Sequence, residues 1–343
     1  MYIALAPMDG ITDCAYRTIS QKIFNKHNTK DELLLCTEFM SADGYFHNPK
    51  GVFHHIIKSN LEKNITVQIF GGNKKNLIFT AKELNDKYNF NAIELNIGCP
   101  SPKIMACGGG VEMLKNKKET LQTIKEISES ISTPFSIKTR LGIKKEDIQE
   151  QLEFIKEASK YCHLIGIHGR TFKQGHSGNV DRDFINQAKK IVNKNCKIIG
   201  NGGIISYEDG ITKCKNLDGA MIGQASIGNP WILTPLSKPD LNELKETIIE
   251  HLELSFAIEV FNKYTWDEKN NICQEFNIND KEKYINIGLN TKDKYRSPVE
   301  FRKHLFSYIK GLNKSKDLKI NIIKYNDFIS VKNEINNYFN NIL

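Results

Sequence analysis

Cys99 is the residue whose type and setting point most directly to chemistry. It follows a short apolar run, stands between Gly98 and Pro100, and precedes the glycine-rich residues 108–110. A loop of this kind leaves a thiol exposed, whereas apolar side chains enclose an inert core cysteine. An unperturbed thiol has a pKa of about 8.5 and is mostly protonated near neutral pH. We therefore predict that Cys99 acts as a nucleophile or as a general acid.

Two cations and a histidine form a second group of candidates. Lys138 and Arg140 lie two residues apart in a strand-like run, so their side chains point to the same face. Unpaired buried charge is costly, so the two cations require an anionic or electron-rich partner. Ion pairs with Glu38 or Glu94 inside the fold would meet this requirement, and that alternative stays open. His168 could also be a structural histidine, so by itself it does not indicate a functional site.

Two small turns predict a phosphate site. Residues 201–203 read Asn-Gly-Gly and residues 223–225 read Gly-Gln-Ala, each directly after an apolar run. Small residues let backbone N–H groups approach an anion. Ordinary turn glycines would explain either segment alone. Because both segments follow consecutive predicted strands, phosphate binding is favoured.

Eight short apolar runs must position these residues. Stretches long enough for a helix separate them, and several are amphipathic, notably 74–88, 119–130, 147–161 and 184–192. Alternating strands and helices predict a parallel sheet, and eight units in residues 1–235 match a (β/α)8 TIM barrel of class α/β. A doubly wound sheet is the alternative, but no G-x-G-x-x-G follows the first run. The predicted strands are 3–6, 33–38, 65–69, 92–96, 135–139, 164–168, 197–201 and 219–222.

The ends of these strands carry the candidate residues. In such a barrel, functional residues lie at the carboxyl ends of the strands. All eight ends contain polar, charged or glycine residues, so we expect them to ring one mouth of the barrel.

The composition changes after residue 235. Two proline breaks predict a linker at 236–240, and a small all-helical domain at 241–343 follows. We expect helices at 241–261, 298–310 and 320–339, and we assign no structure to residues 264–295.

The positive charge of the chain is concentrated near its C-terminus. Residues 281–332 contain 13 Lys and Arg against 5 Asp and Glu, whereas the rest contains 35 of each, so this segment carries the whole net charge of +8. A surface that contacts nucleic-acid phosphates would explain the surplus. A solvated face in a lysine-rich chain is the alternative.

Composition excludes several classes of protein. Of 343 residues, 40% are hydrophobic and 26% are charged, which excludes wholesale disorder, and no apolar run approaches the ~20 residues of a membrane span. The eight cysteines form no C-x-x-C motif, which argues against zinc, an iron–sulfur cluster or a disulfide framework. We expect a monomeric cytoplasmic protein without a signal peptide, metal or membrane contact, in which the other cysteines are core or surface residues.

The strand ends resemble those of the tRNA-dihydrouridine synthases. The Asn-x-Gly-Cys-Pro element at 96–100 is highly specific, and a thinner resemblance continues at Arg302, His304 and Tyr308. The segments that carry it are 6–13, 94–103, 109–110, 138–140, 168–171, 201–204 and 221–225.

The resemblance implies an FMN-binding barrel that reduces the C5=C6 bond of particular uridines in tRNA, with NADPH as the reductant. Reduced FMN would give a hydride to C6, and Cys99 would give a proton to C5. Residues 281–332 would then contact tRNA. An FMN barrel that acts on a small free pyrimidine, like dihydroorotate dehydrogenase, is the alternative, and an RNA-binding protein without catalysis is a third.

The resemblance also implies roles for individual residues. Asn96, Arg140 and Arg170 would bind the substrate. The family commonly has Arg where this chain has Gln224, so the phosphate turn would depend more on backbone N–H groups. The implied FMN contacts are Pro7, Met8, Asp9, Gln68, Lys138, His168, Asn201, Gly202, Gly203, Gly223 and Gln224.

Overall fold

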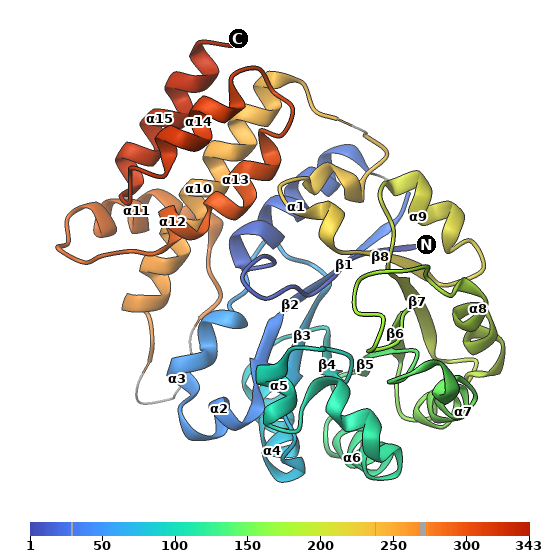
Figure 1. Ribbon diagram of the computed structural model, residues 1–343. Coiled ribbons are helices and arrows are strands. Elements are labelled where there is room, and N and C mark those ends of the chain that lie inside the picture. Colours follow the sequence, from blue (N-terminus) through green and yellow to red (C-terminus); the bar gives the residue numbers. More distant parts are fainter. Residues whose placement is uncertain (29, 237, 268–271, 273) are drawn as a thin grey trace. The chain divides into compact units, whose positions relative to one another are not determined.

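The computed structural model describes the whole chain except residues 29, 237, 268–271 and 273 (Figure 1). The chain divides into two compact units, and residue 237 of the predicted linker lies outside the described residues. The first unit comprises residues 1–7, 30–56 and 64–223. The second comprises residues 8–29, 57–63 and 224–343, so an N-terminal segment is grouped with the C-terminal part of the chain.

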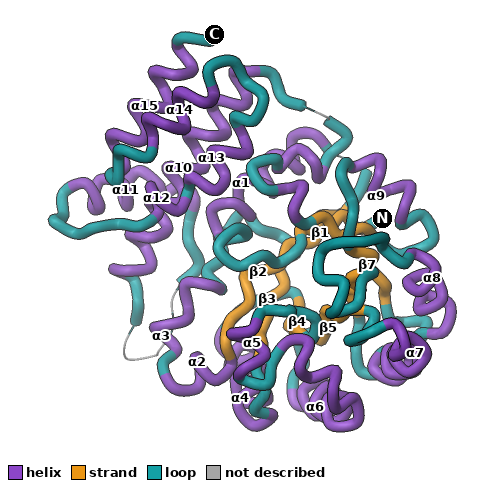
Figure 2. The backbone as a smooth tube through the Cα atoms, in the orientation of Figure 1, coloured by secondary structure: helices purple, strands orange, loops and turns teal. Residues whose placement is uncertain are grey.

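The first unit is a closed barrel of eight parallel strands that follow one another in chain order (Figures 1 and 2). The predicted TIM barrel is confirmed, and the doubly wound sheet is wrong because β1 pairs with β8. The strands are almost entirely buried, which is why each reads as an apolar run. They are β1 (Tyr2–Leu5), β2 (Glu32–Ser41), β3 (Ile65–Phe70), β4 (Ala92–Asn96), β5 (Phe135–Arg140), β6 (Leu164–His168), β7 (Lys197–Asn201) and β8 (Gly219–Ile222).

Helices connect the strands of the barrel. The four helices expected in this unit correspond to α4, α6, α7 and α8. Polar side chains at Asn73, Asn116, Asp181 and Ser206 accept backbone hydrogen bonds and start α4, α6, α8 and α9. The helices are α2 (Ala42–His47), α3 (Pro49–Val52), α4 (Lys74–Lys87), α5 (Pro102–Ala106), α6 (Lys117–Ser130), α7 (Ile148–Ala158), α8 (Arg182–Ile191) and α9 (Tyr207–Lys213).

The second unit is helical. The helix expected at 320–339 is wrong as one element: it is two helices, and the Asp327 side chain starts the second by accepting the N–H of Ser330 at 2.9 Å. The segment 298–310 likewise contains two short helices. Among the described residues, no helix has the length and hydropathy of a membrane span. The helices are α1 (Cys14–His27), α10 (Leu241–Tyr264), α11 (Lys281–Leu289), α12 (Ser297–Glu300), α13 (Arg302–Tyr308), α14 (Ser315–Ile322) and α15 (Phe328–Asn340).

A buried ion pair joins separate segments of the second unit. The side chains of Arg17 and Glu62 are fully buried, and Arg17 Nε lies 2.6 Å from Glu62 Oε1. Arg17 also donates to the carbonyl oxygens of Thr12 and Ile57. Glu62 Oε2 accepts the N–H of Ser59 at 2.7 Å. The pair therefore holds α1 against the segment that contains Glu62.

His304 is a buried structural residue of the second unit. Its Nε2 lies 3.0 Å from the carbonyl oxygen of Ile11, and its Nδ1 accepts the N–H of Gly228 at 3.3 Å. Its ring stacks on Tyr16 with 4.4 Å between centroids. Because Nδ1 accepts a hydrogen bond, Nε2 carries the only ring proton and the imidazole is neutral.

The burial of His304 predicts a dependence of stability on pH. Burial lowers the pKa of His304 to about 4 from an ordinary value of 6.5. Below pH 6.5 the unfolded chain takes up a proton before the folded chain does, so this stabilisation is complete above pH 6.5 and declines as the pH falls toward 4. The contribution is on the order of 3 kcal/mol. Urea unfolding at pH 7 and pH 4.5 should show a smaller decrease for His304→Gln than for the wild type. An equal decrease in both proteins would contradict this prediction.

Candidate active site

The strand register aligns the carboxyl ends of neighbouring strands. Asn96 on β4 is level with Lys138 on β5, and Arg140 on β5 is level with His168 on β6. His168 is in turn level with Asn201 on β7. Polar residues that are distant in the sequence therefore lie on two successive levels near the mouth of the barrel, Asn96 and Lys138 on one and Arg140, His168 and Asn201 on the next.

Three buried side chains form a hydrogen-bonded chain that ends at the Cys99 loop. Glu94 Oε1 accepts from Gln68 Nε2 at 2.5 Å, and Gln68 Oε1 accepts from Asn96 Nδ2 at 2.8 Å. Asn96 Oδ1 accepts the N–H groups of Gly98 and Cys99 at 3.1 and 2.9 Å. Burial raises the pKa of Glu94, and the hydrogen bond from Gln68 opposes this rise. The network fixes the orientation of both amides, so that the oxygen of Asn96 faces the loop.

The Cys99 loop is closed by glycine. The N–H of Val111 donates to the carbonyl oxygen of Cys99 at 3.0 Å. Gly110 has a φ of +59°, and a Cβ there would lie 2.5 Å from the same oxygen, so a side chain is excluded. Cys99 is partly buried, whereas Cys107 in the same loop is exposed and its Sγ donates to Ile104 O at 3.0 Å. Cys273 lies outside the described residues, and the buried cysteines are Cys14, Cys36, Cys162, Cys196 and Cys214.

Lys138 lies between Glu94 and the end of β7. Its Nζ is 3.5 Å from Asn201 Oδ1, while Asn201 Nδ2 donates to Met221 O at 2.8 Å. Gly166 lies beside it, because a Cβ there would be in van der Waals contact with Lys138 Cγ at 3.4 Å. Burial lowers the pKa of Lys138, and the negative charge of Glu94 opposes this effect. The ammonium group would therefore gain from a further electron-rich partner.

Arg140 holds two loops together. Its Nε donates to the carbonyl oxygen of Gly98 at 2.7 Å, and its Nη1 donates to those of Gly175 at 2.9 Å and Thr171 at 3.4 Å. Burial lowers the pKa of Arg140 to about 10, so it remains cationic at neutral pH. The side chain thus anchors the loop of Cys99 to the loop after β6.

His168 and Arg170 form an electropositive cluster. His168 Nε2 and Arg170 Nη1 are 3.3 Å apart, and Arg170 also donates to Gly178 O through Nε at 3.0 Å and Nη2 at 2.9 Å. Burial, followed by the positive charge of Lys138, lowers the pKa of His168 to about 2, so its imidazole is neutral. A cation beside a neutral imidazole suits an anion.

The backbone of the turn after β7 lies next to His168 and Arg170. Gly202 and Gly203 have φ values of +108° and +61°, which side chains rarely adopt. A Cβ on Gly202 would lie 2.9 Å from His168 Nε2. Within the described part of the chain, the N–H groups of Gly203 and Ile204 have no hydrogen-bond acceptor. Unpaired N–H groups in left-handed backbone are typical of phosphate sites.

The remaining predicted site residues divide between the two units. Pro7 and Gly223 belong to the barrel unit, where they follow the adjacent strands β1 and β8. Met8, Asp9 and Gln224 belong to the second unit, and their contact with a cofactor stays a prediction.

Sequence reasoning missed three residues that support the site. The sequence predicts Glu94 only as an ion-pair partner, although its place two residues before Asn96 puts both side chains on one face of β4. Arg182 and Lys213 donate hydrogen bonds to the carbonyl oxygens of the turn after β7. Both lie on helices, where nothing in the local pattern distinguishes them from surface cations.

The sequence of the chain is similar to those of dihydrouridine synthases. The model of the dihydrouridine synthase (Dus) family matches residues 4–343. A probable tRNA-dihydrouridine synthase of Aquifex aeolicus is 30% identical over 271 residues, which cover 74% of this chain and 79% of that protein. One of Helicobacter pylori strain 26695 is 26% identical over 343 residues, with coverages of 99% and 92%. A tRNA-dihydrouridine synthase B of Pseudomonas putida is 26% identical over 264 residues, with coverages of 73% and 75%.

Proposed function

Because this chain belongs to the dihydrouridine synthase family, which is an oxidoreductase family, we propose that it reduces specific uridines in tRNA to 5,6-dihydrouridine. One observation carries the proposal. The hydrogen bonds that link Glu94, Gln68 and Asn96 hold the Cys99 loop at the same barrel mouth as the unpaired N–H groups of the turn after β7. A thiol and an anion site at one mouth suit a flavin and a nucleobase that meet there.

The residues at this mouth fit FMN. The N–H groups of Gly203 and Ile204, together with His168 and Arg170, would hold its phosphate. Lys138 would lie at the ring edge where negative charge develops on reduction. Gln68 and Pro7 are the further ring contacts that we propose in this unit. When bound, FMN supplies the hydride that C6 of the uracil receives, and NADPH is the proposed source of its electrons.

Cys99 is the proposed acid of the reaction. Its thiol would protonate C5 of the uracil on the face opposite the hydride, a role that requires a protonated group near neutral pH. Asn96 positions the Cys99 backbone directly, and Arg140 holds the same loop through Gly98. We propose that Asn96 and Arg140 also orient the uracil, and that Arg170 contacts substrate or cofactor phosphate.

Two measurements test this function. The purified protein should bind FMN with a yellow absorbance, and mapping of dihydrouridine in tRNA from cells with and without the gene should show the loss of specific dihydrouridines. Reduction of a free pyrimidine without any response to tRNA would instead support the alternative function, an FMN barrel that acts on a small free pyrimidine. A protein that stays colourless after FMN is added would contradict flavin chemistry.

Part of the positive charge in residues 281–332 is neutralised within the helical unit. Glu253 on α10, outside this segment, pairs with Lys281 and with Lys332, whose Nζ lies 2.7 Å from Glu253 Oε1. Arg296 pairs with Glu300 at 3.2 Å. We propose that tRNA phosphates contact the exposed lysines of the segment. These are Lys283, Lys292, Lys294, Lys303, Lys310, Lys314, Lys316 and Lys324.

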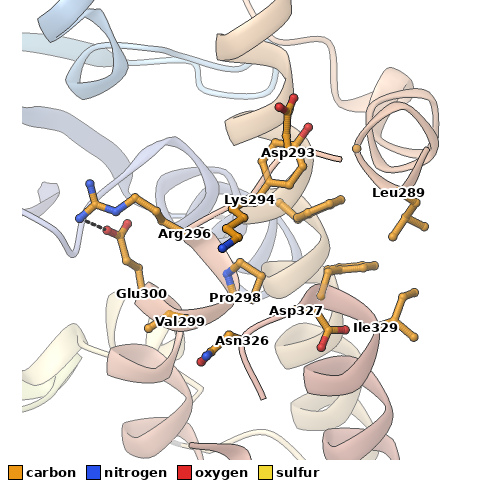
Figure 3. Close-up of a pocket in the computed structure, with 14 residues that line it drawn as sticks. Leu289, Asp293, Lys294, Arg296, Pro298, Val299, Glu300, Asn326, Asp327 and Ile329 are labelled. Atoms are coloured by element: carbon orange, nitrogen blue, oxygen red, sulfur yellow. Dashed lines mark ion pairs between the residues drawn. The ribbon is translucent and has the colours of Figure 1, made fainter. Parts of the chain in front are cut away.

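A cavity of about 820 Å³ opens within the same segment (Figure 3). Lys294 and Arg296 line it together with aromatic residues. Phe256 stacks on Phe328 with 4.5 Å between ring centroids, and Tyr295 meets Phe256 edge-on at 4.9 Å. Three carboxylates, Asp293, Glu300 and Asp327, line the same cavity and outnumber its two cations, so we leave this cavity out of the proposed tRNA contact.

Charge reversal at three exposed lysines tests this surface. Lys310→Glu, Lys316→Glu and Lys324→Glu together should weaken tRNA binding by about tenfold or more and flatten its salt dependence, because phosphate contacts are lost. Binding measured at several salt concentrations checks both effects. The matched control is Lys82→Glu, Lys190→Glu and Lys194→Glu, which makes the same charge change on the barrel unit. Equal affinity and salt slope in the two variants would count against the proposed surface.

A further inference from the structure

The geometry points to Arg182 and Lys213 as positioning residues of the phosphate-binding turn after β7. Arg182 begins α8, and its Nη2 donates to the carbonyl oxygen of Gly202. Lys213 ends α9, and its Nζ donates to the carbonyl oxygen of Gly203 at 2.7 Å. Two helices thus each present a cation to successive peptide groups of one turn. The inference rests on the proposed function, because FMN supplies the phosphate.

The hydrogen bonds from Arg182 and Lys213 fix the direction of two N–H groups in the turn. In a trans peptide the carbonyl oxygen and the N–H of the following residue point in opposite directions. Since the carbonyl groups of Gly202 and Gly203 face the two cations, the N–H groups of Gly203 and Ile204 face away from them. These are the N–H groups for which the described residues provide no acceptor. The cations therefore hold both donors in position for an anion.

The cation Arg170 and the neutral imidazole of His168 also lie beside the turn. A Cβ on Gly203 would lie 3.9 Å from Arg170 Nη2, and a Cβ on Gly202 would lie 2.9 Å from His168 Nε2. A flexible turn between these groups would otherwise be free to rotate its peptides, because glycine has the widest conformational freedom. Fixing the carbonyl groups removes that freedom before the phosphate arrives, which is the general benefit of preorganisation.

The charges around the turn are unbalanced without an anion. Arg182 Nη1 is buried and makes no hydrogen bond in the described structure. Burial lowers the pKa of Arg182, and the charge of Arg170 lowers it further, whereas the negative charge of Asp209 raises it. A phosphate would relieve the repulsion. Arg182 thereby brings a guanidinium group to a turn that, with Gln224 in place of the family's usual Arg, is expected to depend more on backbone N–H groups.

The test compares two flavins that differ only in the phosphate. Fluorescence titration of the apoprotein with FMN and with riboflavin should show that Arg182→Met weakens FMN binding by about tenfold and leaves riboflavin binding unchanged. Arg182→Lys should restore most of the affinity for FMN, because it keeps the charge and a donor. Lys213→Met, at an exposed position, should weaken FMN binding by a few-fold. Lys189→Met, on the same helix as Arg182 but paired with Asp218, is the control and should change neither affinity.

Two outcomes would overturn the inference. Equal weakening of FMN and riboflavin by Arg182→Met would assign the residue a merely structural role, and unchanged FMN binding in both Arg182→Met and Lys213→Met would remove any role at the phosphate. These results are distinct from a failure of the proposed function. If the wild-type protein bound no FMN, the proposed function would fail and this inference with it, whereas FMN binding that is indifferent to both cations overturns the inference alone.

Discussion

Cys99→Ala is expected to lower the rate of uridine reduction by about 100-fold or more while FMN stays bound, because only the proton donor is removed. The Cys99 loop should keep its path, since its hydrogen bonds use backbone groups of Cys99 and the side chain of Asn96. The measurements are the single-turnover rate of dihydrouridine formation with tRNA and the flavin absorbance of the purified variant.

Cys107→Ala is the matched control for this experiment. It removes an exposed thiol from the same loop and should leave the rate near that of the wild type. Unchanged turnover in Cys99→Ala would disprove the assignment of the acid. A large loss in Cys107→Ala would transfer the role to that thiol.

Arg17→Met is expected to destabilise the chain by about 3–5 kcal/mol, because it leaves the carboxylate of Glu62 buried without its partner. Both side chains are fully buried, so water cannot replace the missing cation. The measurement is the free energy of unfolding in urea. The same loss is expected for Glu62→Gln, which leaves the guanidinium unpaired.

Two comparisons make this experiment decisive. The double variant Arg17→Met with Glu62→Leu should lose less stability than the two single changes added together, because both charges are then absent. Lys26→Met on the same helix removes a cation whose side chain is 60% exposed, and about 1 kcal/mol or less is expected there. Additive losses in the double variant would contradict the proposed cost of isolated buried charge.

The strands and the site residues could be predicted from the sequence for one physical reason. Strands buried on both faces are mostly apolar, so a cluster of polar residues after an apolar run indicates a carboxyl end. That rule placed Asn96, Lys138 and His168 together, and the register confirms that they lie along one mouth. The break between α14 and α15 escaped prediction because the apolar spacing continues across it, while Asp327 starts the second helix through a single side-chain hydrogen bond.

Contacts between distant residues could not be predicted. Arg140 and Arg182 both donate to loop carbonyl groups, and every residue type offers such an acceptor, so no pattern announces them. The charge of residues 281–332 shows a related limit. Counting that segment alone could not reveal that Glu253 pairs with both Lys281 and Lys332 and offsets one of their two charges, because Glu253 lies on α10.

The buried amides between β3 and β4 link proton affinity to the order of a distant loop. A proton on Glu94 Oε1 would turn this oxygen into a donor, and Gln68 would have to present its own oxygen instead of its nitrogen. Asn96 would then rotate in turn and direct its nitrogen at the N–H of Cys99, where two donors would oppose each other. The hydrogen bonds from Gln68 to Glu94 and from Cys99 to Asn96 fit an unprotonated Oε1 on Glu94. Protonation of Glu94 inside the barrel and the order of the Cys99 loop at its rim are therefore thermodynamically linked.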